Sequence, residues 1–151
     1  MNIMKISRAN TLKDDPLRDF FVWWDDLTYD DIEKLEIAIK SAKREEDVQE
    51  ILTEIPLLLI QHLGGGHGRW VLPKKKLGGE YVTDFIIGEK HSFGFDWVAV
   101  ELESPKAKMF TVKGDLTKEL THAIRQIQDW RSWIKSNRDY ATRERNKKGL
   151  G

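Results

Sequence analysis

Two apolar stretches that carry acidic residues decide the fold of this chain: Tyr81-Val-Thr-Asp84-Phe-Ile-Ile87 and Trp97-Val-Ala-Val-Glu101-Leu-Glu103-Ser-Pro105. Their apolar runs, residues 85–87 and 98–100, are typical of buried strands. A carboxylate at the end of such a strand is costly to bury unless a partner compensates its charge. A divalent metal ion is one such partner, because hard cations take oxygen ligands.

The spacing of the acids predicts that they lie close together. Residues 89–95 predict a turn centred near Ser92, and an antiparallel hairpin about that turn places Asp84 opposite Glu101. Glu101 and Glu103 are two residues apart, so they share one face of their strand. Three carboxylates on one patch, completed by water, would suit Mg²⁺ or Mn²⁺. The same spacing also fits two solvated strand ends, because an Asp followed by Glu-x-Glu is common by chance.

A long amphipathic helix is predicted over residues 115–136, with Asp115 as its N-cap. Gln126 lies off the apolar face, on the face that carries His122 and Asp129. That face either meets the acidic residues or is exposed to water. The apolar face, which we expect to pack in the core, consists of Leu116, Leu120, Ala123, Ile124, Ile127, Trp130 and Ile134.

The two strand stretches and the helical segment Leu120-Thr-His-Ala-Ile-Arg-Gln126-Ile-Gln-Asp-Trp130 together resemble the Shedu/SduA C-terminal domain family. That family resembles the PD-(D/E)xK nuclease superfamily, and the resemblance covers roughly residues 48–140. It implies that Asp84 and Glu101 are the two acids of the nuclease motif, which are catalytic and hold the metal. It also implies a catalytic role for Gln126, because Gln126 and Trp130 are similar to a helical Gln-x-x-x-Tyr element of some branches.

One position departs from the motif, because Glu103 stands where the superfamily carries a lysine that positions or activates the attacking water. Some restriction enzymes of the superfamily have a glutamate there, so the resemblance is compatible with Glu103 as a catalytic residue, either as a metal ligand or as a general base. The alternative is that Glu103 marks a site that has lost activity. Lys106 and Lys108 are close enough in sequence to supply the positive charge, although ordinary solvated lysines fit the same pattern.

The composition is that of a soluble globular domain. The 151 residues suit one domain with a sizeable core, and 40% of them are hydrophobic and 33% charged. No apolar run is long enough to cross a membrane and no signal peptide is evident, so no membrane association is expected. The absence of cysteine excludes disulfides and cysteine zinc sites and is compatible with a reducing, cytoplasmic location.

The charges are unevenly distributed, although they sum to zero. Residues 1–60 hold 8 Lys and Arg against 14 Asp and Glu, whereas residues 61–151 hold 17 against 11. The basic half is the half with the acidic motif, and phosphate contacts need local positive charge rather than a basic total. Each candidate taken singly also fits a solvated surface, but the residues expected to contact nucleic acid are Lys74, Lys75, Lys76, Lys106, Lys108 and Arg125.

The N-terminal part, about residues 1–63, is predicted to be helical. Residues 1–15 look weakly ordered, and Asp15-Pro16 predicts the start of a short helix that carries the aromatic residues at positions 20, 21, 23 and 24. Thr28 is placed to cap a second helix, with Asp31 at capping-box distance. Residues 45–53 predict a third helix, which Pro56 breaks. Residues 64–68 form a flexible glycine-rich loop before a first strand at residues 69–72.

These elements predict an α+β fold in one domain. N-terminal helices precede a small, mainly antiparallel sheet over residues 69–103, on which the long C-terminal helix packs. The resemblance implies that residues 69–140 form a PD-(D/E)xK-like core, and we expect residues 141–151 to be a flexible tail.

The function implied by the resemblance is that of a Mg²⁺- or Mn²⁺-dependent endonuclease that cleaves nucleic acid, above all DNA, in bacterial defence against phages or plasmids. Two alternatives stay open. The first is a degenerate nuclease-like module that binds nucleic acid or a protein partner without cutting, as the missing lysine suggests. The second is an assembly module, since the exposed edge of a three-stranded sheet allows self-association into a homo-oligomer.

Overall fold

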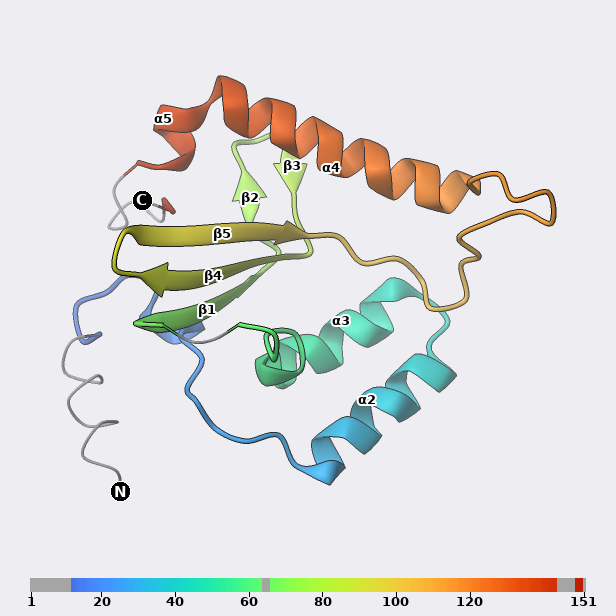
Figure 1. Cartoon of the computed structure of the whole chain (residues 1–151), viewed down its shortest axis with the longest axis horizontal. Coiled ribbons are helices and arrows are strands. Elements are labelled where there is room, and N and C mark those ends of the chain that lie inside the picture. The colour runs from blue at the N-terminus through green and yellow to red at the C-terminus, as the bar shows by residue number, and fades with distance from the viewer. Residues whose placement is uncertain (1–11, 64–65, 144–148, 151) are drawn as a thin grey trace.

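Three antiparallel strands form the central sheet, in the order β1 (Gly68–Pro73), β4 (Phe85–His91) and β5 (Gly94–Val100). The computed structural model describes residues 12–63, 66–143 and 149–150, and it confirms the predicted α+β class (Figure 1). In the described residues β5 pairs with β4 alone, so its outer edge carries no further strand.

The predicted hairpin is confirmed. His91 pairs with Gly94, so the turn between β4 and β5 holds Ser92 and Phe93, where the sequence predicted it. β5 ends at Val100, which makes the sheet shorter than the predicted residues 69–103. Glu101 and Glu103 therefore follow the strand instead of belonging to it.

Helices cover both faces of the sheet. In Figure 1, α2 (Tyr29–Ser41) and α3 (Glu45–Glu54) lie below the sheet, and α4 (Lys118–Ser136) and the short α5 (Arg138–Ala141) lie above it. Neighbouring strand residues point to opposite faces, and both faces are apolar. The core on the α3 side includes Val48, Leu52, Ile60, Val71, Phe85 and Ile87. The core on the α4 side includes Trp70, Leu72, Leu77, Ile86, Trp130 and Trp133.

The connection from β1 to β4 folds into a small excursion that contains β2 (Lys76–Leu77) and β3 (Tyr81–Val82), which pair with each other. The stretch of residues 81–87 is therefore not one continuous strand, because Thr83 and Asp84 separate β3 from β4. The excursion is pressed against α4. A Cβ on Gly78, whose φ is +61°, would lie 2.7 Å from the Trp133 ring.

The helix predicted from Asp15-Pro16 is wrong. In its place the described residues form the 3₁₀ turn η1 (Arg18–Phe20), and the chain then extends along the edge of β1. Phe21 bridges Trp70 in the sheet, and their rings meet edge to face with centroids 5.2 Å apart. Packing of the aromatic side chains against β1 thus outweighs the local helix-start signal.

The next two helices form as predicted. Thr28 and Asp31 make the capping box of α2, since the Thr28 amide donates to Asp31 Oδ2 at 2.9 Å and the Asp31 amide donates to Thr28 Oγ1 at 3.2 Å. α3 begins at Glu45 and ends before Pro56, where the 3₁₀ turn η2 (Pro56–Leu58) follows.

The long helix α4 differs from the prediction in its cap and in its buried face. Thr117 caps it instead of Asp115, because Thr117 Oγ1 accepts a hydrogen bond from the Leu120 amide at 3.3 Å. Ile124 and Ile127, expected in the core, are 37% and 48% exposed. The reason is that the N-terminal half of α4 extends past the sheet (Figure 1), whereas Trp130, farther along, is only 2% exposed.

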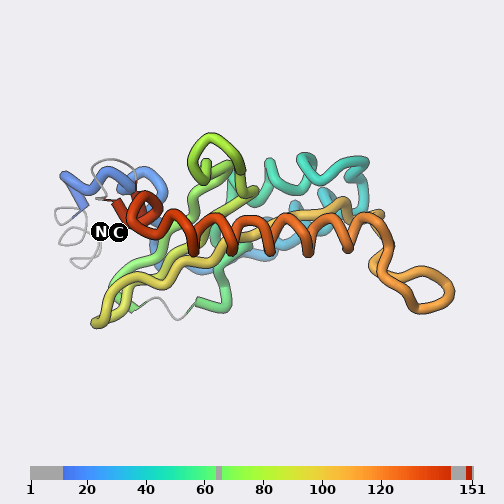
Figure 2. Tube along the Cα trace, turned by 90° about the horizontal axis from the view of Figure 1, so that it is seen from above, coloured from blue at the N-terminus to red at the C-terminus, as the bar shows by residue number. Residues whose placement is uncertain are grey.

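The segment that joins β5 to α4 projects from the body of the fold (orange in Figures 1 and 2). It is a folded loop, because Phe110 bridges Leu116 and the Thr111 amide donates to the Asp115 carbonyl at 2.8 Å. This loop separates the acidic residues after β5 from the start of α4.

The chain ends are described only in part. Leu150, in the expected flexible tail, accepts a hydrogen bond from the Trp97 indole at 2.6 Å, whereas residues 144–148 and 151 lie outside the described residues. The expectations for residues 1–11 and 64–65 also fall outside them. Across the described part of the chain, none of the helices is long and apolar enough to span a bilayer.

Candidate active site

Lys74, Asp84 and Glu101 form a row across one end of the sheet. At this end of the sheet Phe85, in the central strand, pairs with both Pro73 and Val100. Each residue of the row lies one position beyond this set of three along its own strand. The Lys74 amide donates to the Asp84 carbonyl at 2.8 Å, so the pairing of β1 with β4 continues into the row. The predicted placement of Asp84 opposite Glu101 agrees with this register.

Asp84 is a buried carboxylate with both oxygens engaged. The residue is 4% exposed. Its Oδ1 accepts a hydrogen bond from Lys74 Nζ at 2.6 Å, and its Oδ2 accepts one from the Leu102 amide at 2.7 Å. These two donors compensate the cost of burying the charge.

The backbone of Asp84 is held by α3 as well. The Gln49 side chain, itself buried, donates from Nε2 to the Asp84 carbonyl at 3.2 Å. α3 thus reaches the end of the sheet directly, and a residue distant in sequence fixes the position of the motif acid.

Glu101 is half-buried and holds a proton at neutral pH. Burial, the charge of Asp84 and a hydrogen bond to its side chain together raise the pKa of Glu101 from 4.5 to about 8. Smaller contributions come from the charges of Glu45 and Glu103. The neutral form of Glu101 avoids the repulsion between two adjacent carboxylates.

Glu45, the first residue of α3, is an acid of this site that the sequence did not single out. Burial is the main cause that raises its pKa, followed by the charges of Asp84, Glu46 and Glu103, whereas Lys74 opposes the rise. These couplings place Glu45 within electrostatic range of the row. In the sequence it resembles any acid in the first turn of a helix, where the helix dipole favours negative charge.

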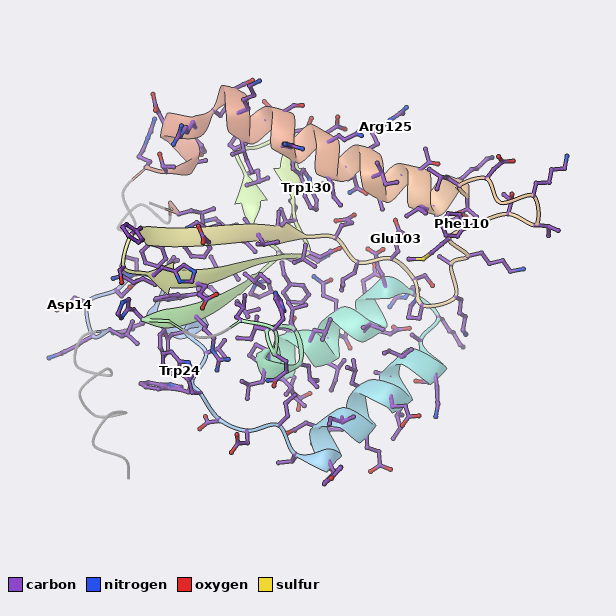
Figure 3. All side chains as sticks on the ribbon, viewed as in Figure 1. Asp14, Trp24, Glu103, Phe110, Arg125 and Trp130 are labelled. Atoms are coloured by element: carbon purple, nitrogen blue, oxygen red, sulfur yellow. The ribbon has the colours of Figure 1, made fainter. Side chains whose placement is uncertain are left out.

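Glu103 lies beyond the end of β5, at a level between α3 and α4 in Figure 3. Its charge raises the pKa of both Glu101 and Glu45. Leu102, the residue between the two glutamates, packs against the core on the α3 side. The alternation expected of an extended chain is therefore kept after the strand ends.

Asp84 and Glu101 are the residues that fit a metal ion. Within the described residues, no three acidic or histidine side chains are arranged as a ready metal site. Mg²⁺ is commonly held by one or two carboxylates, with water and substrate phosphate as its other ligands. The adjacent oxygens of Asp84 and Glu101 match that requirement.

Gln126 and Arg125 occupy different sides of α4. Gln126 is half-buried, one turn away from the buried Ala123 and Trp130, so it faces inward. In the described residues no hydrogen bond joins Gln126 to Asp84 or Glu101. Arg125 is exposed and lies on the side of α4 away from the sheet, opposite Trp130 (Figure 3).

The lysines expected to contact nucleic acid lie in two places. Lys74, Lys75 and Lys76 belong to the excursion after β1, and the Lys74 ammonium lies 2.6 Å from the Asp84 carboxylate. Lys106 and Lys108 are exposed on the projecting loop that starts after Glu103. A run of three lysines in the sequence does not reveal that Lys74 turns toward the carboxylate.

Comparison with known proteins identifies the family. No curated protein and no solved structure matches the chain. The family model described as Shedu protein SduA, C-terminal, matches residues 42–150, which include α3, the sheet, the acidic row and α4. The chain therefore belongs to the Shedu SduA C-terminal family, a family of defence-associated domains.

Proposed function

We propose that this domain is a Mg²⁺- or Mn²⁺-dependent endonuclease that cleaves DNA as part of bacterial defence. The observation that carries the proposal is the pair of Asp84 and Glu101, a buried carboxylate and a protonated one side by side at the end of the sheet. Acidic side chains with shifted pKa values are concentrated at functional sites. Family membership and the resemblance to the PD-(D/E)xK superfamily support the same reading.

A divalent metal bound at this pair would supply Lewis-acid polarisation of a phosphate and would make a water more acidic. Asp84 is held ready for that role by the Leu102 amide, which fixes one carboxylate oxygen. Glu101, in its ionised form, would be the second oxygen ligand.

Glu103 and Gln126 are the residues that complete the chemistry in this proposal. Glu103 adds a third carboxylate near the pair, where it either joins the metal ligands or accepts a proton from the attacking water. Gln126, on the inward side of α4, orients that water or the scissile phosphate. Both roles need substrate in place, because neither side chain is joined to Asp84 by a hydrogen bond in the described residues.

Lysines on two sides of the row supply the positive charge that a DNA backbone requires. The exposed Lys106 and Lys108 follow Glu103 on the projecting loop, and the lysines of the excursion follow β1. A duplex that spans both would pass over the end of the sheet. This arrangement explains how an acidic site in a chain of zero net charge can accept a polyanion.

The experiment that tests the proposal is cleavage of supercoiled, linear and single-stranded DNA, and of RNA, with Mg²⁺, Mn²⁺, Ca²⁺ or EDTA. We expect wild type to cut DNA with Mg²⁺ or Mn²⁺ and not with EDTA. Asp84→Asn and Glu101→Gln should abolish cutting, whereas Glu80→Gln, which changes an exposed acid in the excursion, should not. Cleavage that survives EDTA or Asp84→Asn would reject the proposal.

The competing function is that of a degenerate module that binds nucleic acid without cutting. Two observations favour it: Glu103 replaces the motif lysine, and Lys74 already neutralises Asp84. This module would bind DNA equally well with and without EDTA and would cut none of the substrates. The same panel of substrates, followed by gel-shift measurements, separates the two functions.

A further inference from the structure

Lys74 is set apart from the other lysines by its backbone. Its φ is +46°, a conformation that among the described residues other than glycine belongs to Lys74 alone. Left-handed backbone is strained for a lysine and is concentrated at functional positions. Here it comes with a fixed geometry, because the Lys74 amide donates to the Asp84 carbonyl while its ammonium reaches the Asp84 side chain.

The ammonium of Lys74 interacts with two members, Asp84 and Glu45, of a cluster of four acids. It lies 2.6 Å from Asp84 Oδ1, and Glu45, Glu101 and Glu103 are all coupled electrostatically to each other or to Asp84. Asp84 is buried, whereas the Lys74 side chain is 51% exposed. One partner of this pair is therefore fixed and the other is free to swing on a flexible four-carbon stem.

A divalent cation at Asp84 and Glu101 would compete with that ammonium. The cation needs the carboxylate that Lys74 now neutralises, and two positive charges bound to the same carboxylate would repel each other. Lys74 also borders a shallow depression lined by Glu46, Gln49 and Pro73, so its side chain has open space beside the pair. The Lys74 side chain therefore has room to move away from Asp84.

We propose that Lys74 is an exchangeable cation of the active site: its ammonium occupies Asp84 in the metal-free protein, and once a divalent cation replaces it there, it contacts the phosphate being cleaved. This inference rests on the proposed function. The ammonium then supplies, from the end of β1, the positive charge that position 103 lacks. It stabilises the negative charge that develops on the phosphate oxygens.

The test uses Lys74→Asn, because asparagine tolerates positive φ and removes the charge. The control is Lys90→Gln, which removes the charge of an exposed lysine at the end of β4 away from Asp84. Lys74→Arg keeps a charge at the site. Thermal unfolding first establishes that all three variants fold, and then Mn²⁺ affinity is measured by calorimetry and cleavage by a plasmid assay.

We expect Lys74→Asn to bind Mn²⁺ about tenfold more tightly than wild type, because a positive charge has left the site. The same variant should cleave about 100-fold more slowly, the loss typical of one group that stabilises developing charge. Lys90→Gln should match wild type in both measurements, and Lys74→Arg should recover part of the cleavage that Lys74→Asn loses. Tighter metal binding with slower cleavage is a combination that a merely structural lysine does not produce.

Two results would overturn the inference. If Lys74→Asn binds Mn²⁺ no more tightly than wild type, Lys74 does not compete with the metal, whether or not the protein cuts DNA. If it binds more tightly and cleaves as fast as wild type, the ammonium does not act on the phosphate. If wild type cuts no substrate, the proposed function fails, and tighter Mn²⁺ binding by Lys74→Asn would still support the exchange at Asp84.

Discussion

The main-chain amide of Leu102 donates a hydrogen bond to Asp84 Oδ2 at 2.7 Å, and this contact ties together the two acidic stretches of the sequence. Leu102 stands between Glu101 and Glu103, and its own side chain packs into the core on the α3 side. The contact therefore fixes the segment that carries both glutamates, although the strand has already ended.

Asp84→Ala should destabilise the protein as well as remove metal binding. The Leu102 amide would lose its acceptor and Lys74 its partner, and a buried donor left unpaired costs about 1–3 kcal/mol. Asp84→Asn keeps an acceptor for that amide and should cost less. Urea unfolding of the two variants without metal measures the difference, and equal losses would show that the Leu102 contact contributes nothing.

The protonated state of Glu101 predicts how stability depends on pH. Its pKa is raised from 4.5 to about 8 on folding, so between these values the folded protein binds a proton that the unfolded chain releases. The contribution to the free energy of unfolding is therefore fully present below about pH 4.5 and is lost as the pH rises through about 8. Urea midpoints of wild type and Glu101→Gln across this range should diverge, since the glutamine does not titrate.

Metal binding should show the opposite dependence on pH. Glu101 must lose its proton to act as a ligand, so Mn²⁺ affinity should rise as the pH approaches about 8, with release of about one proton per ion bound. Calorimetry in buffers of different ionisation enthalpy counts that proton. Release of no proton would mean that Glu101 is already ionised or is not a ligand.

Residues of α4 should differ sharply in their importance for stability. Trp130 is 2% exposed and belongs to the core on the α4 side, so Trp130→Ala should cost about 3–5 kcal/mol. Ile127→Ala, at a position 48% exposed, should cost less than about 1 kcal/mol. A large loss with Ile127→Ala would indicate that another chain or segment covers this side of the helix.

Variants of Glu103 distinguish an active nuclease site from a degenerate one. If it is a ligand or base, Glu103→Ala should abolish cleavage as fully as Asp84→Ala. Glu103→Lys restores the usual motif but places an ammonium near Glu101, so we expect impaired cleavage and weaker metal binding. Cleavage gained by Glu103→Lys over an inactive wild type would establish the degenerate alternative.

Local patterns predicted the parts of the fold that depend on neighbouring residues. Hydrophobic runs and a turn near Ser92 were sufficient for the hairpin, and Thr28 with Asp31 for the start of α2. The errors arose where distant contacts decide. Phe21 joins the edge of β1 instead of a helix, and the inward face of α4 is set by the limited length of the sheet beneath it.

In the site, too, local patterns predicted some features, whereas contacts between distant residues set the others. The pairing of Asp84 with Glu101 follows from counting residues about the turn, which a single sequence permits. Glu45 and Gln49 come to the site only because α3 packs against the end of the sheet. Lys74 was one of three adjacent lysines, and its backbone conformation, which turns it toward Asp84, has no signature in the sequence.

The central claim is metal-dependent cleavage at Asp84 and Glu101, and its most direct test is the rate at which supercoiled plasmid is nicked with Mn²⁺. We predict that wild type and Glu80→Gln nick the plasmid at similar rates, that EDTA stops both, and that Asp84→Asn, folded and soluble, is inactive. Nicking by Asp84→Asn at the rate of wild type would contradict the account.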